Sequence, residues 1–513
     1  MSDGWPIPFV QLYAAAAALL VASLGYVYLT YHYGKWAALG VSHAAPTPPF
    51  GSLSDVAMGR VPLVDVVHSL YQQFDGQRYF GIYEGRKPLL VIRDPQLVYT
   101  VMVKDFRSFV DRNANKVSFV HDKLFDHLVN LRGEQWKAIR AKLSPTFSAA
   151  KLKSMLSDIN VCTARLIDNL NEQITSNSGI VDVSEASAQF TTDTIGRCAF
   201  GLDLNTLSDP DSEFRRTGRE VLMPRFRSTL LNLIRLLGFG RLLDVFRIRG
   251  MPSYIYDFFD NLLETTIEQH KHDENARNDF IALLVKLKDE EKLKENEQKL
   301  FTDDILAANA FVFFIAGFET TASTISYCLY ELAMNPEIQV KLREKIKQTL
   351  DANDGKLSYD TLKDMKYLDM VINETLRLYP SVPVLGRVCT QKYTIADSNI
   401  SLNVGERLLI PIYSLHHDPK YYSDPNIFDP ERFTEENISS RPHGTFLPFG
   451  DGPRICIGLR FAMMETKSGL AEILSRFEVS PCKKTQNPIK INPRTILLTP
   501  KQSICLSFKK IDQ

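Results

Sequence analysis

The stretch that most restricts how this chain can fold is FGDGPRICIG, residues 449–458, where one cysteine lies among three glycines, a proline and an arginine. An apolar helical pattern follows over 459–477, so a helix N-terminus with its partial positive charge is predicted directly after the loop. Arg454 adds a full positive charge. Both charges favour the thiolate form of Cys456 over the thiol.

The residues around Cys456 also leave space. Gly452 and Gly458 have no side chains, so backbone N–H groups can approach the sulfur and a flat ligand can lie close to it. Phe449 is placed to cover such a ligand. A thiolate beneath a flat ligand is an arrangement that binds haem iron. The loop therefore predicts a haem site with Cys456 as the axial ligand.

A second motif, AGFETT, begins at Ala316 in an apolar pattern over 302–334, which predicts a helix about 50 Å long at ~1.5 Å per residue. Ala316, Gly317 and Thr320 fall on one face of this helix. Gly317 is expected to leave a gap, beside which the Thr320 hydroxyl bonds back to the carbonyl of Ala316. With the Glu319 carboxylate, this makes a place for dioxygen and a route for protons. An ordinary packing kink explains the same residues.

Two further pairs of side chains, at helical spacing, have simple structural interpretations when each is considered alone. WKAIR places Trp136 and Arg140 four residues apart on a helix, which suits a cation–π pair. ETLR places Glu374 and Arg377 on one helix face, a spacing most often found in a surface ion pair worth about 0–1 kcal/mol.

The whole-chain composition excludes several classes of protein. The 513 residues hold 60 Lys and Arg against 60 Asp and Glu, so no net charge draws the chain to nucleic acid. Its 7 cysteines have no CxxC spacing, which argues against a disulfide framework or a zinc site. The main body is therefore expected to face a reducing compartment.

Residues 1–34 are predicted to form a membrane anchor, because no charged side chain occurs between positions 5 and 34 and the run is long enough to span a bilayer. A cleaved signal peptide is the alternative. Lys35 follows the span, which places the body in the cytosol by the positive-inside rule. The aromatic residues expected near the two interfaces are Trp5, Tyr31, Tyr33 and Trp36.

The remainder is predicted to be a proline-rich hinge, residues 35–52, followed by one catalytic domain, residues 53–513, that is mainly α with a minor β part. RYFGIYEG and KPLLVIRD read as a strand pair. Residues 215–250 hold nine arginines among leucines. This segment suits either a packed helix pair with a solvated face or a second membrane contact.

A family resemblance rests on these motifs. FGDGPRICIG fits F-x-x-G-x-R-x-C-x-G, the haem-binding signature of the cytochrome P-450 superfamily, at every specified position. AGFETT, ETLR and PERF precede it in the family's order. KLSPTF, ETLRLYPSVPVLGRVCT, HHDPKYYSDP and FDPERF are most similar to the insect microsomal family tied to detoxification. The resemblance covers nearly the whole chain and implies the cytochrome P-450 fold.

The resemblance also implies site residues. Cys456 is the implied axial ligand of the haem iron, and Glu319 and Thr320 are the implied catalytic pair. The residues expected to contact haem are Trp136, Arg140, Ala316, Gly317, Arg387, Phe449, Gly452, Arg454 and Gly458. Those expected to bind its propionates are Trp136, Arg140, Arg387 and Arg454. Those expected to fix the cysteine loop through a buried network are Glu374, Arg377 and Arg432.

The implied activity is that of a haem b monooxygenase that inserts one atom of O₂ into lipophilic xenobiotics, such as insecticides or plant toxins, or into endogenous lipids and hormones. Its electrons come from NADPH through a cytochrome P-450 reductase, with cytochrome b5 as a further partner. The implied location is the endoplasmic reticulum membrane, with the catalytic domain in the cytosol. A haem-thiolate isomerase or dehydratase that needs no external electrons and a non-enzymatic haem carrier are the alternatives.

Positions elsewhere in the chain give weaker expectations. The candidate cationic docking residues are Lys137, Lys142 and Arg460. The expected substrate-pocket walls are Phe106–Val120, residues 205–250, Phe313, Ala316, Val382–Leu385 and Ile496–Leu498. His416 and His417 have no third ligand at a useful spacing, so a structural role is expected for both.

Overall fold

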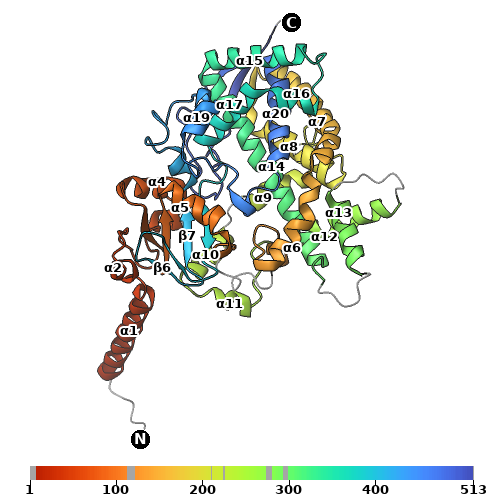
Figure 1. The fold of residues 1–513 in the computed structure, drawn as a ribbon. Helices are drawn as coiled ribbons and strands as arrows, with labels where there is room; N and C mark the ends of the chain where they lie inside the picture. The colour runs from red at the N-terminus through yellow and green to blue at the C-terminus, as the bar shows by residue number, and fades with distance from the viewer. Residues whose placement is uncertain are drawn as a thin grey trace.

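The computed structural model of this protein describes residues 7–112, 122–209, 211–222, 226–272, 280–292 and 299–511. Its longer α-helices are α1 (Ile7–Thr30), α4 (Leu63–Gln73), α6 (Gly133–Leu143), α7 (Ala149–Ser176), α8 (Val183–Phe200), α9 (Glu213–Leu222), α10 (Phe226–Leu236), α12 (Ser253–His272), α13 (Phe280–Lys292), α14 (Asp303–Met334), α15 (Pro336–Asp351), α17 (Lys366–Leu378) and α20 (Leu459–Arg476). The shorter ones are α2 (Lys35–Ala38), α3 (Ser54–Ala57), α5 (Pro95–Tyr99), α11 (Gly240–Val245), α16 (Tyr359–Asp364), α18 (Ile412–His416) and α19 (Glu435–Ser440). The predicted mainly α class is confirmed (Figure 1).

The β part consists of three small sheets. Their strands are β1 (Tyr79–Glu84), β2 (Lys87–Ile92), β3 (Ile180–Asp182), β4 (Leu385–Val388), β5 (Tyr393–Thr394), β6 (Ser401–Leu402), β7 (Arg407–Ile410), β8 (Phe477–Pro481) and β9 (Cys505–Lys510). The largest sheet has the order β1-β2-β7-β4. The predicted strand pair is its antiparallel β1–β2 hairpin, with Glu84 opposite Lys87. The other two sheets have the orders β3-β9-β8 and β5-β6.

The central helix is α14, which confirms the helix predicted over 302–334. The Thr302 side chain caps its N-terminus by accepting a hydrogen bond from the Ile305 N–H at 3.3 Å. The helix packs against α8, α12, α17 and α20, and 67% of its most apolar window is buried. Its apolar composition therefore makes it a core helix, although it is long enough to cross a membrane.

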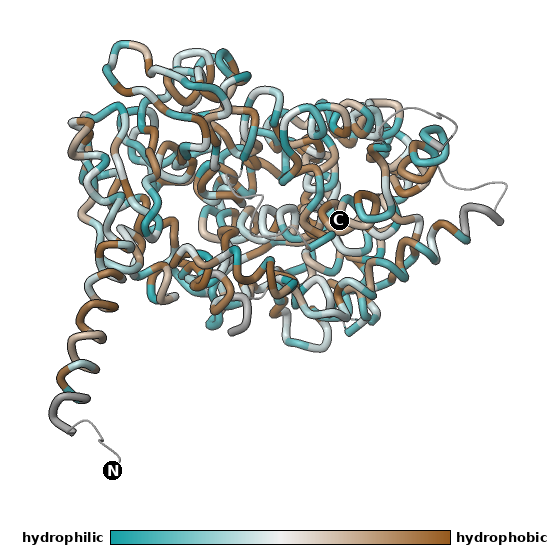
Figure 2. The backbone as a smooth tube through the Cα atoms, turned by 90° about the horizontal axis from the view of Figure 1, so that it is seen from below, coloured by the Kyte–Doolittle hydropathy of each residue, from teal (hydrophilic) through white to brown (hydrophobic). Residues whose placement is uncertain are grey.

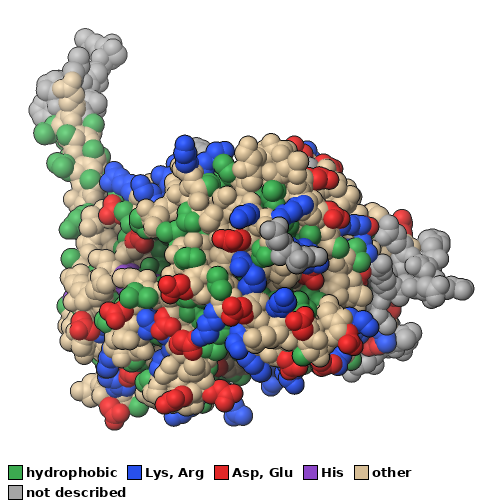
Figure 3. All heavy atoms as spheres, turned by 90° about the horizontal axis from the view of Figure 1, so that it is seen from above, with side chains coloured by type: hydrophobic (Ala, Val, Ile, Leu, Met, Phe, Trp, Pro, Cys, Tyr) green, Lys and Arg blue, Asp and Glu red, His purple; other side chains and the backbone are tan. Residues whose placement is uncertain are grey.

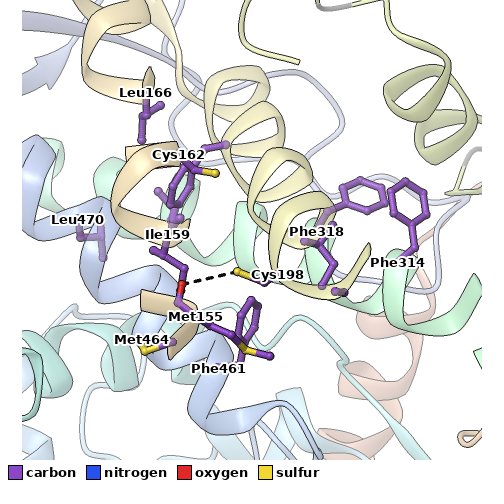
Figure 4. Close-up of a cluster of buried hydrophobic side chains, with 14 of the residues drawn as sticks. Met155, Ile159, Cys162, Leu166, Cys198, Phe314, Phe318, Phe461, Met464 and Leu470 are labelled. Carbon is purple, nitrogen blue, oxygen red and sulfur yellow. Dashed lines mark hydrogen bonds between the residues drawn. The ribbon is translucent and has the colours of Figure 1, made fainter. Parts of the chain in front are cut away.

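The main hydrophobic core lies where α7, α8, α14 and α20 meet. Figure 4 shows part of it, with side chains from these helices pointing toward one another. Labelled members that are buried include Ile159, Cys162, Cys198, Phe314 and Leu470. The Cys198 thiol lies 3.8 Å from the Met155 carbonyl oxygen. Removing such side chains from water is the main stabilising contribution, at about 25 cal/mol per Å² of apolar surface.

The N-terminal helix α1 projects from the body (Figures 1 and 2). None of its apolar window, Gln11–Thr30, is buried in the protein. Two interface expectations need correction. Trp36 is buried, and its indole N–H donates to the Ile82 carbonyl at 3.0 Å. Tyr33 packs on Tyr83 of the body. Tyr31 is 75% exposed, as an interface role requires, and Trp5 lies outside the described residues.

Residues 35–52, predicted as a hinge, are attached to the first sheet. The Ala44 N–H donates to the Gly81 carbonyl at 3.0 Å, and the Ser52 N–H donates to the Tyr83 carbonyl at 2.8 Å. Trp36 occupies the space beside Gly81, where a Cβ atom would come within 2.4 Å of the indole ring. This segment is therefore fixed to the body rather than extended away from it.

Surface charge agrees with the neutral composition. Figure 3 shows acidic and basic side chains interspersed over the face seen from above. The chain as a whole has a formal net charge of zero.

Candidate active site

The cysteine loop lies between the short 3₁₀ turn η6 (Gly452–Arg454) and the start of α20. The Cys456 N–H donates to the Phe449 carbonyl at 2.9 Å, which closes the loop. The helix predicted over 459–477 is present as Leu459–Arg476. The Cys456 side chain is exposed, although protein surrounds it closely enough to desolvate it. Cys456 therefore opens into a hollow within the domain.

The electrostatics of Cys456 differ from those expected. Desolvation raises the pKa of its thiol above the ordinary value. The Gly458 backbone N–H, Arg112 and Arg140 act in the opposite direction, and Arg454 is not among the main causes. The protein alone therefore holds this cysteine as a thiol. A positively charged metal centre would reverse the balance, because a coordinated thiol is deprotonated.

Two glycines serve packing in this region. Gly452 has φ +67, and a Cβ atom there would lie 2.0 Å from the Met102 carbonyl oxygen. Gly317 was expected to leave a gap, but a Cβ atom there would lie 2.7 Å from Ile195 of α8. Both predictions of open space are therefore wrong, because chain from elsewhere fills it. At Gly458, by contrast, the nearest atom is 3.8 Å away, on Phe147.

Four arginines gather at the cysteine loop. Arg112 donates to the Arg454 carbonyl at 2.7 Å, and Arg140 donates to the Ile455 carbonyl at 2.9 Å. Burial and the neighbouring Arg112 lower the pKa of Arg387 and Arg454 to about 9. Among the described residues, the carboxylate paired with this group is Asp111, 3.7 Å from Arg454. The buried positive charge therefore exceeds the negative charge beside it, and an anionic ligand would stabilise it.

The four arginines differ in what their N–H groups bind. Arg454 donates to the carbonyls of Val110 at 2.9 Å and Leu131 at 2.6 Å, and its guanidinium lies 4.1 Å from the Trp136 ring centroid. The cation over Trp136 is therefore Arg454 rather than Arg140. Arg387 keeps Nε and Nη2 buried without a hydrogen-bond partner. Among the predicted propionate arginines, Arg387 therefore keeps two buried donor atoms free for an anionic ligand.

Arg112 is a site residue that the motif analysis did not single out. It is half-buried, its buried Nε atom has no hydrogen-bond partner, and its charge acts on Cys456. It belongs to the predicted pocket wall Phe106–Val120, of which residues 113–120 lie outside the described residues. Its neighbours in the sequence carry no motif, and its role depends on contact with a loop 342 residues later.

The hydrogen bond predicted within α14, from Thr320 to Ala316, is present. The Thr320 hydroxyl donates to the Ala316 carbonyl at 2.8 Å. Ala316 is exposed even though most of the helix is buried, so this face also borders open space. Phe147, which lies beside Gly458, stacks on Phe313 of α14 with ring centroids 5.8 Å apart. The cysteine loop and this helix are therefore near neighbours.

The Glu319 side chain does not face the space at Cys456 and Ala316. It lines a separate, partly open cavity of about 940 Å³. Desolvation raises the pKa of Glu319 to about 7, against the opposing effect of Arg215. Arg215 is held by Glu185, with its Nη2 2.9 Å from the carboxylate. The Ser323 hydroxyl donates to Glu319 at 3.5 Å. The cavity includes Ile496, Leu497 and parts of the 215–250 segment, and its walls do not include Phe313, Ala316 or Val382–Leu385.

The network predicted from ETLR and PERF comes together in the structure. Arg377 forms a two-point ion pair with Glu374, both distances being 2.7 Å, and both side chains are fully buried. Arg432 lies 3.4 Å from the same carboxylate. Arg377 also donates to the carbonyls of His416 and Pro425. These bonds fix the segment that precedes the cysteine loop.

His416 and His417 each contact a backbone group, and the Nδ1 atom of His417 lies 2.8 Å from the Tyr413 carbonyl oxygen. The Leu447 N–H donates to the Nε2 atom of His416 at 2.9 Å. Among the described residues, no group of three or more His, Cys, Asp or Glu side chains is placed to hold a metal ion.

We expect Glu374→Gln to lower the free energy of unfolding by about 3–5 kcal/mol, because it leaves the buried Arg377 without its charge partner. Lys153→Gln, at a pair 52% and 72% exposed, is the matched control and should change it by about 0–1 kcal/mol. Denaturant unfolding followed by circular dichroism measures both. Equal small effects would show that the buried network does not stabilise the fold.

The donor set fits haem. Buried arginine N–H groups without partners suit propionates, and an accessible cysteine just before the N-terminus of a helix suits the iron.

Comparisons with known proteins agree with this assignment. The family model described as Cytochrome P450 matches residues 42–508. Cytochrome P450 6a2 of Drosophila melanogaster is 38% identical over 513 residues, 98% of this chain and 100% of that protein. Cytochrome P450 6j1 of Blattella germanica is 36% identical, covering 95% of each chain.

Fold and site together define a haem-thiolate monooxygenase, an oxidoreductase that uses haem and O₂. The chain belongs to the cytochrome P450 family. Its predicted resemblance to insect members is confirmed, because both relatives are insect proteins and both carry the number 6 in their cytochrome P450 names. Redox partners and lipophilic substrates are general properties of this family.

Proposed function

We propose that this protein is an NADPH-dependent monooxygenase of the endoplasmic reticulum that oxidises lipophilic xenobiotics or endogenous lipids. The observation that carries the proposal is the excess of arginines over carboxylates around an accessible Cys456, near a helix that bears Glu319 and Thr320. Bound haem b supplies the iron that activates dioxygen. Cys456 would be its axial ligand, and Arg387, Arg112 and Arg140 would hold its propionates.

The role proposed for α14 is proton delivery. Glu319 opens to a cavity with solvent access and has a pKa of about 7, so it can both gain and lose a proton near neutral pH. The Thr320 hydroxyl is held by the Ala316 carbonyl and keeps its oxygen lone pairs for a water molecule or the reacting oxygen. Protons thus pass from the cavity through the Glu319 carboxyl to the neighbourhood of the Thr320 Oγ1 atom.

The product formed per NADPH consumed should fall as the pH rises through about 7, because Glu319 loses its proton there. Arg215 and Glu185 are the charged side chains beside it. Glu319→Gln should give a low ratio that does not change over this range. The measurement is product against NADPH oxidation, each corrected for the pH dependence of the reductase. Parallel pH profiles in parent and variant would contradict this role.

The electron donor is proposed to be a membrane-bound flavoprotein, NADPH–cytochrome P-450 reductase, with cytochrome b5 as an additional donor. Lys137 and Lys142 are exposed on α6, which Arg140 ties to the cysteine loop. Arg460 is exposed in the first turn of α20. These cations therefore lie around the loop that would hold the haem, where an acidic partner would bring its flavin nearest.

A second membrane contact is proposed beside the N-terminal helix. α11 lies on the side from which α1 projects (Figure 1), and Tyr28 of α1 stacks on Phe239. Exposed apolar side chains gather here, with Val245 73% and Phe246 71% exposed. Such side chains beside arginines suit a bilayer surface.

Deleting residues 1–34 should leave a folded haem protein that still partly binds membranes through the apolar side chains of α10 and α11. Fractionation of the truncated protein with vesicles, at low and high salt, measures this. Complete release at low salt would refute the second contact. Resistance of the full-length protein to carbonate washing would support a true span, and its extraction by carbonate would refute the anchor.

The function is tested by NADPH oxidation with reductase, in the presence and absence of ligands that shift the Soret band. A monooxygenase consumes NADPH and forms oxidised product. An isomerase or dehydratase forms product without NADPH, and a carrier forms none. The ligand screen should compare insecticides and plant toxins with steroids, terpenoid hormones and fatty acids, because the substrates of this family are lipophilic and these classes differ in origin.

A further inference from the structure

Two cysteines outside the haem site face each other across the antiparallel pair β8–β9. Pro481 is paired with Leu506, so the next residues along the two strands are Cys482 and Cys505. The Cys482 thiol lies 3.5 Å from the Cys505 carbonyl oxygen. Paired residues within such a ladder have Cα atoms roughly 4.5–5.5 Å apart. This spacing lies within the roughly 4.4–6.8 Å that a disulfide spans, so extending the ladder by one residue and turning the Cys482 thiol from the carbonyl to the sulfur of Cys505 would let the two sulfurs join.

This pair is also more accessible than the four buried cysteines. Cys482 and Cys505 are both partly exposed, whereas Cys162 and Cys198 are buried in the core (Figure 4). Burial raises the pKa of the Cys505 thiol above its ordinary value, and the neighbouring Lys484 only partly opposes this effect. Cys505 is therefore harder to ionise than an ordinary thiol, which leaves Cys482 as the sulfur that attacks an oxidant first.

We propose that Cys482 and Cys505 form a reversible disulfide when the protein meets hydrogen peroxide. The Cys482 thiolate attacks one peroxide oxygen, the O–O bond breaks, and a sulfenic acid and hydroxide result. The Cys505 sulfur then attacks the sulfenic sulfur and expels its oxygen as water. Overall, two thiols lose two electrons and two protons, and one peroxide becomes two waters. A small thiol such as glutathione restores both cysteines by exchange.

The link would close the base of a loop that reaches the cavity beside α14. Within that loop, Ile491 bridges Pro500, and Ile496 and Leu497 line the cavity. Leu498 is tied to the helix by the hydroxyl of Tyr327, 3.2 Å from its carbonyl. The β8–β9 ladder ends just before the two cysteines. A disulfide there prevents the ladder from opening at the root of the loop.

The inference does not depend on the proposed function, because peroxide from any source can drive it. It does suit an enzyme of this class. Reduced oxygen that escapes when proton delivery fails leaves as hydrogen peroxide, and the loop lies on the cavity that serves Glu319. The disulfide would thus form in response to the peroxide that unproductive turnover releases.

The test is peptide mass spectrometry on the folded full-length protein, treated with a small molar excess of hydrogen peroxide and quenched with catalase before alkylation and trypsin. Cleavage after Arg476, Lys483, Lys501 and Lys509 yields FEVSPCK and QSICLSFK. We expect these peptides to appear joined, two hydrogen atoms lighter than their sum. Most of the reduced FEVSPCK signal should be lost, and dithiothreitol should restore it.

Internal and matched controls keep the result decisive. Cys162 and Cys198 should stay reduced in the same digest, because peroxide does not reach them in the folded core. Cys482→Ser and Cys505→Ser should each abolish the joined peptide. The proposal is overturned if Cys482 accumulates as unlinked sulfinic acid, or if it links to buried cysteines as often as to Cys505. Slower hydrogen exchange over residues 483–504 after oxidation would support the closed loop, and unchanged exchange would refute that consequence.

Discussion

Cys456→Ser should abolish the strongly red-shifted Soret band of the reduced CO complex and reduce product formation to background. The band depends on a thiolate that pushes electron density toward the iron, and a serine hydroxyl does not replace that thiolate. The protein itself gives no other thiol at this place, since the remaining cysteines lie in the core or in other loops and strands. The effect should therefore be complete rather than partial.

The matched control is Cys482→Ser, which removes a partly exposed thiol that lies outside the loop, beyond α20. It should keep the red-shifted band and the activity. Haem content and circular dichroism must be measured on both variants, because a variant that fails to bind haem also lacks the band. A Cys456→Ser protein that retains haem and the red-shifted band would disprove the axial assignment.

Thr320→Val should leave haem content and the CO spectrum unchanged while product falls about tenfold or more, within the ~10²–10⁴-fold range of positioned proton transfer. NADPH oxidation should continue, and the missing product should appear as hydrogen peroxide. Valine nearly preserves the shape of threonine but removes the hydroxyl that lies 2.8 Å from the Ala316 carbonyl. Electron supply is untouched, so the loss is one of proton delivery alone.

Thr324→Val is the matched control, because the Thr324 hydroxyl makes the same kind of helix bond, 2.8 Å to the Thr320 carbonyl, one turn further along. Its ratio of product to NADPH consumed should match that of the parent. If both variants lose the same fraction of product, the effect comes from altered helix packing. If Thr320→Val forms as much product per NADPH consumed as the parent, AGFETT is a packing kink with no role in proton delivery.

The sequence predicted the parts of the site whose geometry is local. Helix spacing placed Glu374 and Arg377 on one face, and the loop FGDGPRICIG placed Cys456 before a helix. The bond from Thr320 to Ala316 follows from the four-residue turn. Such features depend on neighbours in the chain, and the chemistry of a few side chains defines them.

Features that depend on distant partners were missed or misread. Gly317 was read as a gap, but Ile195 fills it from another helix. Trp36 was placed at a membrane interface, but it packs against Gly81 of a strand that comes later in the chain. Arg112 carries no motif of its own and joins the site through Arg454. Periodicity shows which face of an element is apolar and does not show what covers that face.

The raised pKa of Cys456 is a related case. The sequence indicated a thiolate from the helix N-terminus and Arg454, two local charges. The folded protein adds desolvation from many directions, and that effect is the larger one. The Cys456 thiol would therefore lose its proton on coordinating a metal, and not before.

The measurement that tests the central claim most directly is turnover under heavy-isotope dioxygen, with the purified protein, its reductase, NADPH and a lipophilic ligand that shifts the Soret band. The account predicts one heavy oxygen atom in each product molecule and none when unlabelled dioxygen is used with heavy water. Product whose added oxygen comes from water, or product formed at the same rate without NADPH, would contradict it.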